Sequence, residues 1–287
     1  MSEKNEGLGL VLEGGGMRGV FTAGVLDFFL EENFFVDKVI GVSAGAVEAV
    51  NFVSRQEKRG YRVIATYARD KRYMSFRSLL LTGDLFNKKF CYERIPDELD
   101  PFDYATFRGS PIRTYAAATN VLTGEVSYLE LSDLRLDMEK LRASGSLPLV
   151  SNLVKIDGIP FLDGGIADSI PFRAMLGMGC SKCVVVLTRD ASYRKKPNRL
   201  MPLIRLKYRK YPRFVAACEN RFRAYNETLC ALKEAEARGE VFIIRPQRKV
   251  EVGRLEKDAR KLEALYDEGF NEAKNRFEDL KRFIGKM

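Results

Sequence analysis

Residues 8–19, "LGLVLEGGGMRG", place a short apolar run directly before a glycine-rich loop. Residues 20–33, "VFTAGVLDFFLEEN", then carry apolar side chains at helical spacing, and "VDKVIGV" (36–42) is a second apolar run. The small residues of "AGAVEAVNFVSRQ" (44–56) favour a second helix that packs closely. Strands that alternate with helices in this way predict a parallel sheet with right-handed crossovers. We therefore expect an α/β fold.

Two pairs of strands are predicted further along the chain. "RTYAAATN" (113–120) and "EVSYLEL" (125–131) have the pattern of strands joined by a short turn. "VKIDGIPFLDGG" (154–165) has the pattern of a hairpin that turns at Asp157-Gly158, a pair that favours a type I′ turn. Both pairs are expected to extend the central sheet.

The last third of the chain contributes more of the same fold. "KCVVVLT" (182–188) and "VFIIRP" (241–246) are apolar runs suited to buried strands. Residues 255–284 form a long amphipathic pattern, which predicts a C-terminal helix. Since no internal repeat or low-complexity linker interrupts the sequence, we expect one domain over residues 1–287, with a mostly parallel central sheet flanked by helices and a helical C-terminal region.

Composition favours a folded protein in a reducing compartment. The 287 residues are 46% hydrophobic and 30% charged, and no apolar run approaches the roughly 18 residues that a membrane span needs. The polar N-terminus has no signal-peptide core, and the five cysteines are scattered, which favours a cytoplasmic location with free thiols. A zinc site built on "CSKC" (180–183) is the less favoured alternative to buried structural cysteines.

The net charge of +9 is concentrated in one segment. Residues 191–218 contain nine basic residues and no acidic one: Arg194, Lys195, Lys196, Arg199, Arg205, Lys207, Arg209, Lys210 and Arg213. Such a segment indicates a phosphate-bearing partner, either a nucleic acid or a membrane surface, unless it is an ordinary solvated face.

The stretch "VIGVSAGA" (39–46) has the Gly-x-Ser-x-Gly pattern that presents a nucleophilic serine on a tight strand-to-helix turn. Gly41 and Gly45 flank Ser43, so strand and helix can approach closely. The chain has no histidine, so the base that activates this serine must be a lysine, an aspartate or a glutamate. An incidental serine in a glycine turn is the plainer interpretation. The glycine loop one strand earlier favours the interpretation of Ser43 as a catalytic serine, because both loops would emerge at one edge of a parallel sheet.

Gly14, Gly16 and Gly19 also fit the Gly-x-Gly-x-x-Gly pattern of dinucleotide-binding loops. That interpretation requires an acidic residue at the end of the next strand, and Ser43 stands there instead. The other use of such a loop is an oxyanion hole, in which the N–H groups of Gly15, Gly16 and Met17 point at a developing negative charge. Arg18 adds positive charge that either holds the turn or faces a substrate phosphate.

Asp163 is the strongest candidate for the base. It ends an apolar strand in "FLDGG" (161–165), where burial would make it a better proton acceptor, and Gly164 and Gly165 would let the serine come close. The other carboxylates have plainer explanations. Asp157 falls in a hairpin turn, Asp168 resembles a helix cap, and Asp190, at a strand end, has no neighbouring glycine.

Three segments together resemble the signatures of the patatin-like phospholipase family: "GGGMRG" (14–19), "GVSAG" (41–45) and "DGG" (163–165). "ASGSLPLV" (143–150) is similar to a segment that precedes the aspartate in that family. The resemblance runs from about residue 7 to residue 171. It implies a three-layer fold with Ser43 as nucleophile, Asp163 as base and the Gly14–Gly19 loop as oxyanion hole. It also implies hydrolysis of lipid acyl esters, as in phospholipase A or lysophospholipase activity, with neither metal nor cofactor.

We therefore expect a lipid acyl hydrolase. The alternatives are a nucleotide-binding oxidoreductase that uses the glycine loop, and a non-catalytic protein that binds lipid or nucleic acid. Apolar residues alternate with the basic residues of 191–218, which favours peripheral contact with an anionic membrane surface. No nucleic-acid-binding module is recognisable, so no nucleic-acid partner is expected.

Overall fold

The computed structural model describes residues 7–285. Eight strands of this part of the chain form one sheet, in the order β5-β6-β3-β2-β1-β7-β8, with β4 paired to β3 along Thr114–Thr119. Their bounds are Leu8–Leu12 (β1), Lys38–Val42 (β2), Arg113–Asn120 (β3), Val126–Leu131 (β4), Val154–Ile156 (β5), Ile159–Asp163 (β6), Lys182–Val186 (β7) and Val241–Ile244 (β8). These strands match the segments predicted from the sequence.

The sheet is mostly parallel. β3, β2, β1, β7 and β8 run parallel to one another, and β4, β5 and β6 add antiparallel pairs at one side. The β5–β6 hairpin turns at Asp157 and Gly158, whose φ angles of 50° and 79° are those of the predicted type I′ turn. Because parallel strands end at the same edge, the loops after β1 and β2 lie side by side.

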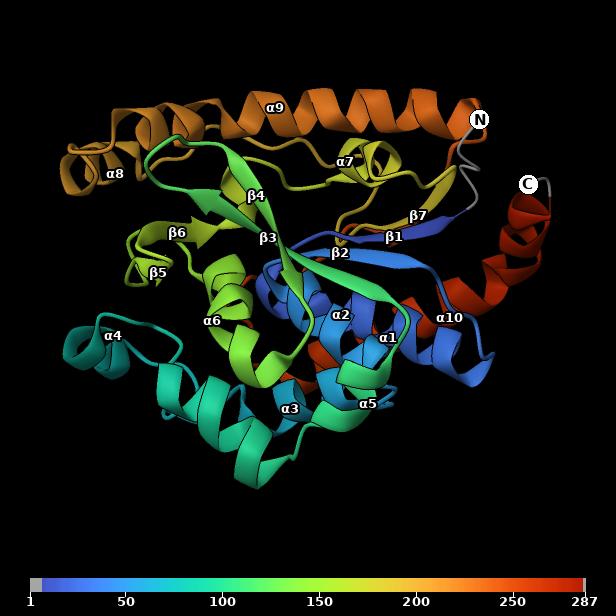
Figure 1. The fold of residues 1–287 in the computed structure, drawn as a ribbon, viewed down its shortest axis with the longest axis horizontal. Helices are drawn as coiled ribbons and strands as arrows, with labels where there is room; N and C mark the ends of the chain where they lie inside the picture. The colour runs from blue at the N-terminus through green and yellow to red at the C-terminus, as the bar shows by residue number, and fades with distance from the viewer. Residues whose placement is uncertain (1–6, 286–287) are drawn as a thin grey trace.

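Helices cover both faces of the sheet (Figure 1). On one face lie α1 (Gly19–Glu31), α2 (Ala44–Val53) and α10 (Ala259–Ile284), and on the other α7 (Phe172–Gly177) and α9 (Pro212–Ala237). The side chains of β1 alternate between the two layers, with Leu10 and Leu12 in one core cluster and Val11 in the other. Burial on both faces explains why these strands are continuously apolar. The fold is the expected three-layer α/β arrangement.

The C-terminal helix packs tightly on the first helix of the chain. A Cβ atom at Gly24 of α1 would overlap the carbonyl oxygen of Tyr266, and one at Gly269 of α10 would overlap that of Phe21. The Tyr266 hydroxyl donates a hydrogen bond of 2.8 Å to buried Asp27. The predicted helix over 255–284 therefore exists, but it begins at Ala259.

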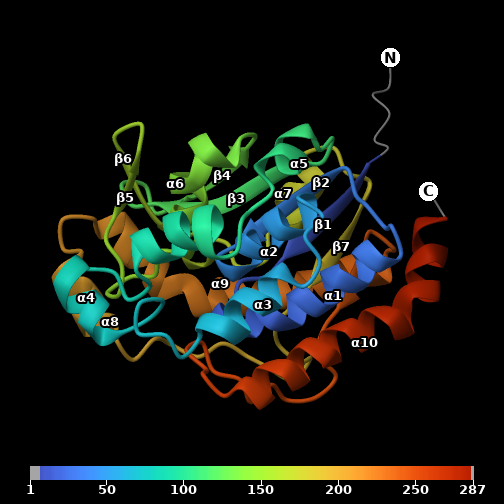
Figure 2. The same ribbon diagram turned by 90° about the horizontal axis from the view of Figure 1, so that it is seen from below.

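Most of the helices between β2 and β3 were not predicted from the sequence. This insertion contains α3 (Arg59–Tyr67), α4 (Phe76–Thr82), the π-helical segment η2 (Phe90–Leu99) and α5 (Tyr104–Gly109). α6 (Leu134–Gly145) follows β4, α8 (Met201–Lys207) precedes α9, and short 3-10 turns, η1 (Gly16–Arg18) and η3 (Gly164–Ile166), follow β1 and β6. Figure 2 shows α4 and α8 at one end of the molecule and the end of α10 at the other. No helix within residues 7–285 is both long and apolar enough to cross a membrane.

All five cysteines are free thiols. Cys180 and Cys183 are buried beside β7, whereas Cys218 and Cys230 lie on α9. Among the residues that the structure describes, no group of three or more metal-ligating side chains comes together.

Candidate active site

Ser43 lies between β2 and α2 in a strained backbone conformation, with φ 56° and ψ −122°. Strand and helix meet so closely here that a Cβ atom at Gly45 would overlap the carbonyl oxygen of Leu12, and one at Gly41 would overlap Ala46. A larger residue at either glycine would force the turn apart. The sequence pattern therefore folds into the tight strand-to-helix turn that exposes a serine side chain.

The backbone of this turn is held by a residue that the sequence did not single out. The N–H of Ser43 donates a hydrogen bond of 2.9 Å to Oγ of Ser144, which is fully buried at the end of α6. Ser144 belongs to the segment 143–150, so its neighbourhood was predicted to matter but its contact was not. The amide of Ser43 is occupied and does not contribute to an oxyanion hole.

The glycine loop packs directly against the serine. A Cβ atom at Gly14 would lie 2.9 Å from Cβ of Ser43 and 2.7 Å from the carbonyl oxygen of Val42. The N–H of Met17, which was expected to be an oxyanion donor, donates to the carbonyl oxygen of Arg254 at 3.2 Å. The amides of Gly15 and Gly16 have no acceptor among the described residues and remain candidates. Gly19 opens α1 immediately after this loop.

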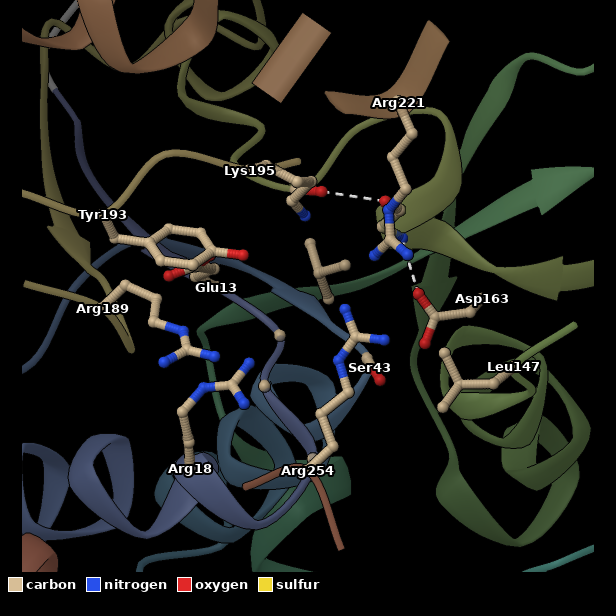
Figure 3. A pocket seen from close by; sticks show the side chains of 16 residues that line it. Glu13, Arg18, Ser43, Leu147, Asp163, Arg189, Tyr193, Lys195, Arg221 and Arg254 are labelled. Atoms are coloured by element: carbon tan, nitrogen blue, oxygen red, sulfur yellow. Dashed lines mark hydrogen bonds between the residues drawn. The ribbon is translucent and has the colours of Figure 1, made fainter. Parts of the chain in front are cut away.

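Asp163 ends β6 and is 1% exposed. Its Oδ1 accepts a hydrogen bond of 2.8 Å from the N–H of Gly165, while Oδ2 has no hydrogen-bond partner in residues 7–285. Gly164 packs against Ala117 of β3, where no side chain would fit. Asp163 and Ser43 line the same pocket (Figure 3). A buried carboxylate oxygen without a donor is the chemistry expected of a proton acceptor.

The competing carboxylates are used elsewhere. Asp157 is at the hairpin turn, and Asp168 accepts hydrogen bonds from the Tyr128 hydroxyl at 2.8 Å and the Ile170 amide at 3.0 Å. Asp190 accepts from the Ser192 amide at 3.0 Å. None of the three lines the pocket of Ser43.

Five cationic side chains surround this pocket: Arg18, Arg189, Lys195, Arg221 and Arg254 (Figure 3). Arg18 is 5% exposed, and burial together with repulsion from Arg189 lowers its pKa to about 10. Burial also lowers the pKa of Lys195 and that of Arg221. Of these five residues, the sequence analysis singled out only Arg18, in the glycine loop, and Lys195, in the basic segment. Arg189, Arg221 and Arg254 gave no signal there.

Glu13 also lines the pocket, but its carboxylate is satisfied. It accepts hydrogen bonds of 2.7 Å from the Thr188 amide and 2.7 Å from the Tyr225 hydroxyl. Glu13 thereby ties β1 to the loop after β7 and to α9. This role explains its burial at 4% exposure between an apolar strand and a glycine loop.

A second cavity, of about 130 Å³, adjoins Ser43 on the side of α2 and α3. Its walls are largely apolar and include Val47, Val63, Ile64, Tyr73 and Phe86. One ordered water needs only about 10–15 Å³, so this cavity has room for several carbon atoms. Gly16, Ser43, Leu147 and Arg254 line both cavities. The serine therefore stands between a cationic pocket and an apolar one.

Comparison with protein families decides where this site belongs. The model of the patatin-like phospholipases matches residues 10–176, which include Ser43, Asp163 and the glycine loop. The chain belongs to the patatin-like phospholipase family. This membership favours the hydrolase over the dinucleotide-binding alternative. A second model, a domain of unknown function (DUF6363), matches residues 211–285.

Curated relatives match about two thirds of the chain. YjjU of Escherichia coli, an uncharacterized protein, is 30% identical over an alignment of 195 residues that covers 63% of this chain and 52% of YjjU. Lysophospholipase NTE1 of Debaryomyces hansenii is 26% identical over 196 residues, 63% of this chain and 12% of that protein. NTE1 of Saccharomyces cerevisiae is 28% identical over 199 residues, 63% and 11% respectively. This patatin-like chain thus spans about half the length of YjjU and a small part of NTE1.

Among solved structures, VipD from Legionella pneumophila aligns over 96% of this chain and 67% of its own, with a TM-score of 0.48 and 13% identity. Within the patatin-like chain itself, the two family matches divide the site. Ser43, Asp163 and Arg18 lie inside the patatin match, whereas Arg221 and Arg254 lie inside the second match.

Proposed function

We propose that this patatin-like protein hydrolyses acyl esters of lipids, as a phospholipase A or lysophospholipase, through an acyl-enzyme on Ser43. The observation that carries the proposal is the position of Ser43, on a strained turn that shares a pocket with the unpartnered Oδ2 of Asp163. The name of the NTE1 relatives, lysophospholipase, supports the same class of substrate.

The first half of the reaction follows from the site. Asp163 takes the proton of Ser43 as its Oγ attacks the ester carbonyl carbon. The amides of Gly15 and Gly16, with the charge of Arg18, stabilise the oxyanion. The protonated carboxyl of Asp163 then returns the proton to the departing alcohol, and the acyl group stays on Ser43.

In the second half of the reaction, water is the nucleophile and Ser43 is the leaving group. Water enters where the alcohol left, Asp163 takes one of its protons, and the resulting nucleophile attacks the acyl carbonyl. Ser43 leaves with the proton and the fatty acid is released. The apolar cavity on the α2 side suits the acyl chain throughout, which leaves the cationic pocket for the alcohol part of the substrate.

We test this proposal with a panel of defined lipids of one acyl length: phospholipids, lysophospholipids and neutral acylglycerols. Released fatty acids are identified by mass. The purified protein should release fatty acid from at least one of these esters, and Ser43→Ala should not. If the wild-type protein releases none from any ester, or Ser43→Ala releases as much, the proposal fails.

We also propose that the protein reaches its substrate by peripheral contact with an anionic membrane surface. α8 and the residue before it expose Leu200, Leu203 and Leu206, by 51%, 54% and 66%. α4 exposes Phe76, Leu80 and Leu81 at the same end of the molecule (Figures 1 and 2). Apolar side chains beside lysines and arginines suit a membrane interface.

We propose that only some of the basic residues of 191–218 serve this contact. Lys195 lines the pocket of Ser43, so it is not part of the membrane-facing surface. Nε of Arg205 lies 2.6 Å from Oε1 of Glu219, so Arg205 is already paired in an exposed ion pair, whose attraction added salt weakens. Arg199, Lys207, Arg209 and Lys210 are exposed close to these leucines in the sequence and carry the proposed contact.

A further inference from the structure

We propose that the cationic pocket beside Ser43 is a subsite for a phosphomonoester dianion on the departing alcohol of the substrate. The enzyme then prefers acyl esters of phosphorylated alcohols to esters whose alcohol is neutral or zwitterionic. The inference rests on the proposed function for the position of the scissile ester, but anion binding itself does not depend on catalysis.

The charges of this pocket do not balance. Five cations and two carboxylates, Glu13 and Asp163, line it, which leaves a net charge of +3 when all are ionised. Within residues 7–285, none of the five cations forms an ion pair with a carboxylate. Glu13 is already engaged by Thr188 and Tyr225. Burial, and after it repulsion from Arg189, lowers the pKa of Arg18 to about 10.

Several donors in the cluster have no partner. Nε and Nη1 of Arg18, Nε of Arg189 and Nε of Arg221 are buried and make no hydrogen bond among the described residues. Each such donor destabilises the pocket while it stays unpaired. The oxygens of a phosphate group provide acceptors that arginine side chains match in geometry and charge. A bound phosphate would satisfy these donors and offset the excess charge together.

Position fixes which part of the substrate the anion belongs to. The apolar cavity meets Ser43 from the side of Val47 and Val63 and is also lined by Arg254, whereas the other four cations line only the cationic pocket. If the acyl chain occupies the apolar cavity, the alcohol half of the ester lies among the cations. Nη2 of Arg221 lies near Gly165, beside the proposed base, so a phosphate held there remains close to the reacting ester.

A dianion fits the cluster better than the headgroup of a zwitterionic lipid. A phosphodiester carries a single negative charge, and a choline group would bring a further cation into a pocket of net charge +3. A phosphomonoester carries nearly two negative charges at neutral pH and three free oxygens. The pocket therefore discriminates by charge.

The elements that supply the cations lie mostly outside the patatin match. Arg189 and Lys195 follow β7, Arg221 is on α9, and Arg254 precedes α10. Only Arg18 comes from residues 10–176. The C-terminal part of the chain therefore selects the alcohol half of the substrate.

The kinetic test compares three soluble esters with one short acyl chain: an acylglycerol 3-phosphate, the matching acylglycerophosphocholine and the matching monoacylglycerol. We expect kcat/KM to be at least about tenfold higher for the phosphomonoester, and Lys195→Gln or Arg254→Gln to lower this preference by about tenfold. Lys196→Gln is the matched control, because Lys196 is exposed and outside the pocket. It should keep the preference. Equal kcat/KM for all three esters, or an unchanged preference in the pocket variants, overturns the inference.

The binding test uses Ser43→Ala protein with glycerol 3-phosphate and, separately, glycerol, measured by calorimetry. Glycerol 3-phosphate should bind and glycerol should not, and adding Lys195→Gln should weaken the affinity by about tenfold. Absence of binding overturns the subsite. If the Ser43→Ala protein binds glycerol 3-phosphate but the wild-type protein hydrolyses no ester in any panel, the proposed function is refuted and the subsite is retained. The two failures are therefore distinguishable.

Discussion

The backbone N–H of Ser43 donates a hydrogen bond to Oγ of Ser144, 2.9 Å away, although 101 residues separate the two in the chain. Three residues after Ser144, Leu147 lines the pocket, and the carbonyl oxygen of Ser146 accepts the backbone N–H of Asp163 at 2.7 Å. One short segment therefore contacts both the proposed nucleophile and the proposed base. A dyad has no third residue to orient its base, and this segment supplies that support.

Removal of the Ser144 hydroxyl should misplace the turn of Ser43. Ser144→Ala leaves the Ser43 amide without its acceptor, so we expect kcat on a soluble ester to fall about tenfold and the free energy of unfolding to fall by about 1–2 kcal/mol. Ser146→Ala is the matched control, because its hydroxyl donates only to the Arg142 carbonyl oxygen. It should lose stability but keep most activity. Equal losses of kcat in the two variants would contradict a positioning role for Ser144.

Replacement of the proposed base should remove activity without unfolding the protein. Asp163→Asn keeps the shape of the side chain but accepts no proton, so we expect ester hydrolysis to fall by roughly two to four orders of magnitude. Asp168→Asn should cost stability rather than rate, because Asp168 binds Tyr128 and Ile170 away from the pocket. Turnover is measured before and after treatment with a chelator. Near wild-type turnover in Asp163→Asn, or loss of wild-type activity to the chelator, would refute the metal-free dyad.

Glu48 should make stability depend on pH. It is buried in the wall of the apolar cavity, where loss of solvation raises its pKa to about 8 from an ordinary value of 4.5. Between these pH values the unfolded chain has lost the proton and the folded chain keeps it. The free energy of unfolding therefore falls as pH rises from 4.5 to 8, by about 5 kcal/mol in all.

Urea unfolding at several pH values between 5 and 8 checks this. Glu48→Gln mimics the protonated carboxyl, so its free energy of unfolding should decline less steeply with pH than that of the wild type. The two curves should converge near pH 5. Parallel curves across this range would show that Glu48 keeps an ordinary affinity for its proton.

The proposed membrane contact predicts salt-sensitive binding to anionic vesicles and little binding to neutral ones. Each lysine or arginine near such a surface contributes about 1 kcal/mol, so replacing Arg199, Lys207, Arg209 and Lys210 by Gln should reduce binding strongly. Activity on vesicles should fall with it, while hydrolysis of a short soluble ester stays close to that of the wild type. Sedimentation with vesicles measures the binding.

A charge-matched control separates this surface from net charge. Arg238, Lys274, Lys281 and Arg282 are exposed at the end of α9 and along α10, away from α8 (Figure 1). Their replacement by Gln removes the same four charges and should change binding less. If both quadruple variants bind anionic vesicles equally, 191–218 is not a specific contact surface.

Local sequence patterns were sufficient to predict the elements that carry Ser43 and Asp163. β1, the glycine loop, β2 and the turn at Ser43 are contiguous, so apolar runs and glycine spacing report them directly. The β5–β6 hairpin that ends at Asp163 has an equally local signature. The helices between α2 and β3 were missed because they are short and irregular, and one of them is a π-helix with Pro96 inside.

The cationic pocket was beyond the reach of local patterns. Arg189, Arg221 and Arg254 come from three separate elements, and only the packing of α9 and of the loop before α10 on the sheet brings them together. The same packing brings the carbonyl oxygen of Arg254 to the amide of Met17, which was expected to point at the oxyanion. Lys195 was singled out in the sequence as part of the basic segment, but in the structure it lines the pocket of Ser43.

The central claim is that Ser43 is the nucleophile, and covalent labelling tests it most directly. We expect a fluorophosphonate to add one adduct to the wild-type protein, located by peptide mass spectrometry at Ser43, and to leave Ser43→Ala unlabelled. Ser169→Ala is the control, because Ser169 lines the same pocket but donates its hydroxyl to the Gly165 carbonyl oxygen at 2.8 Å. It should still be labelled at Ser43. An adduct on Ser169 or any other serine, or no adduct on a protein that hydrolyses esters, would contradict the account.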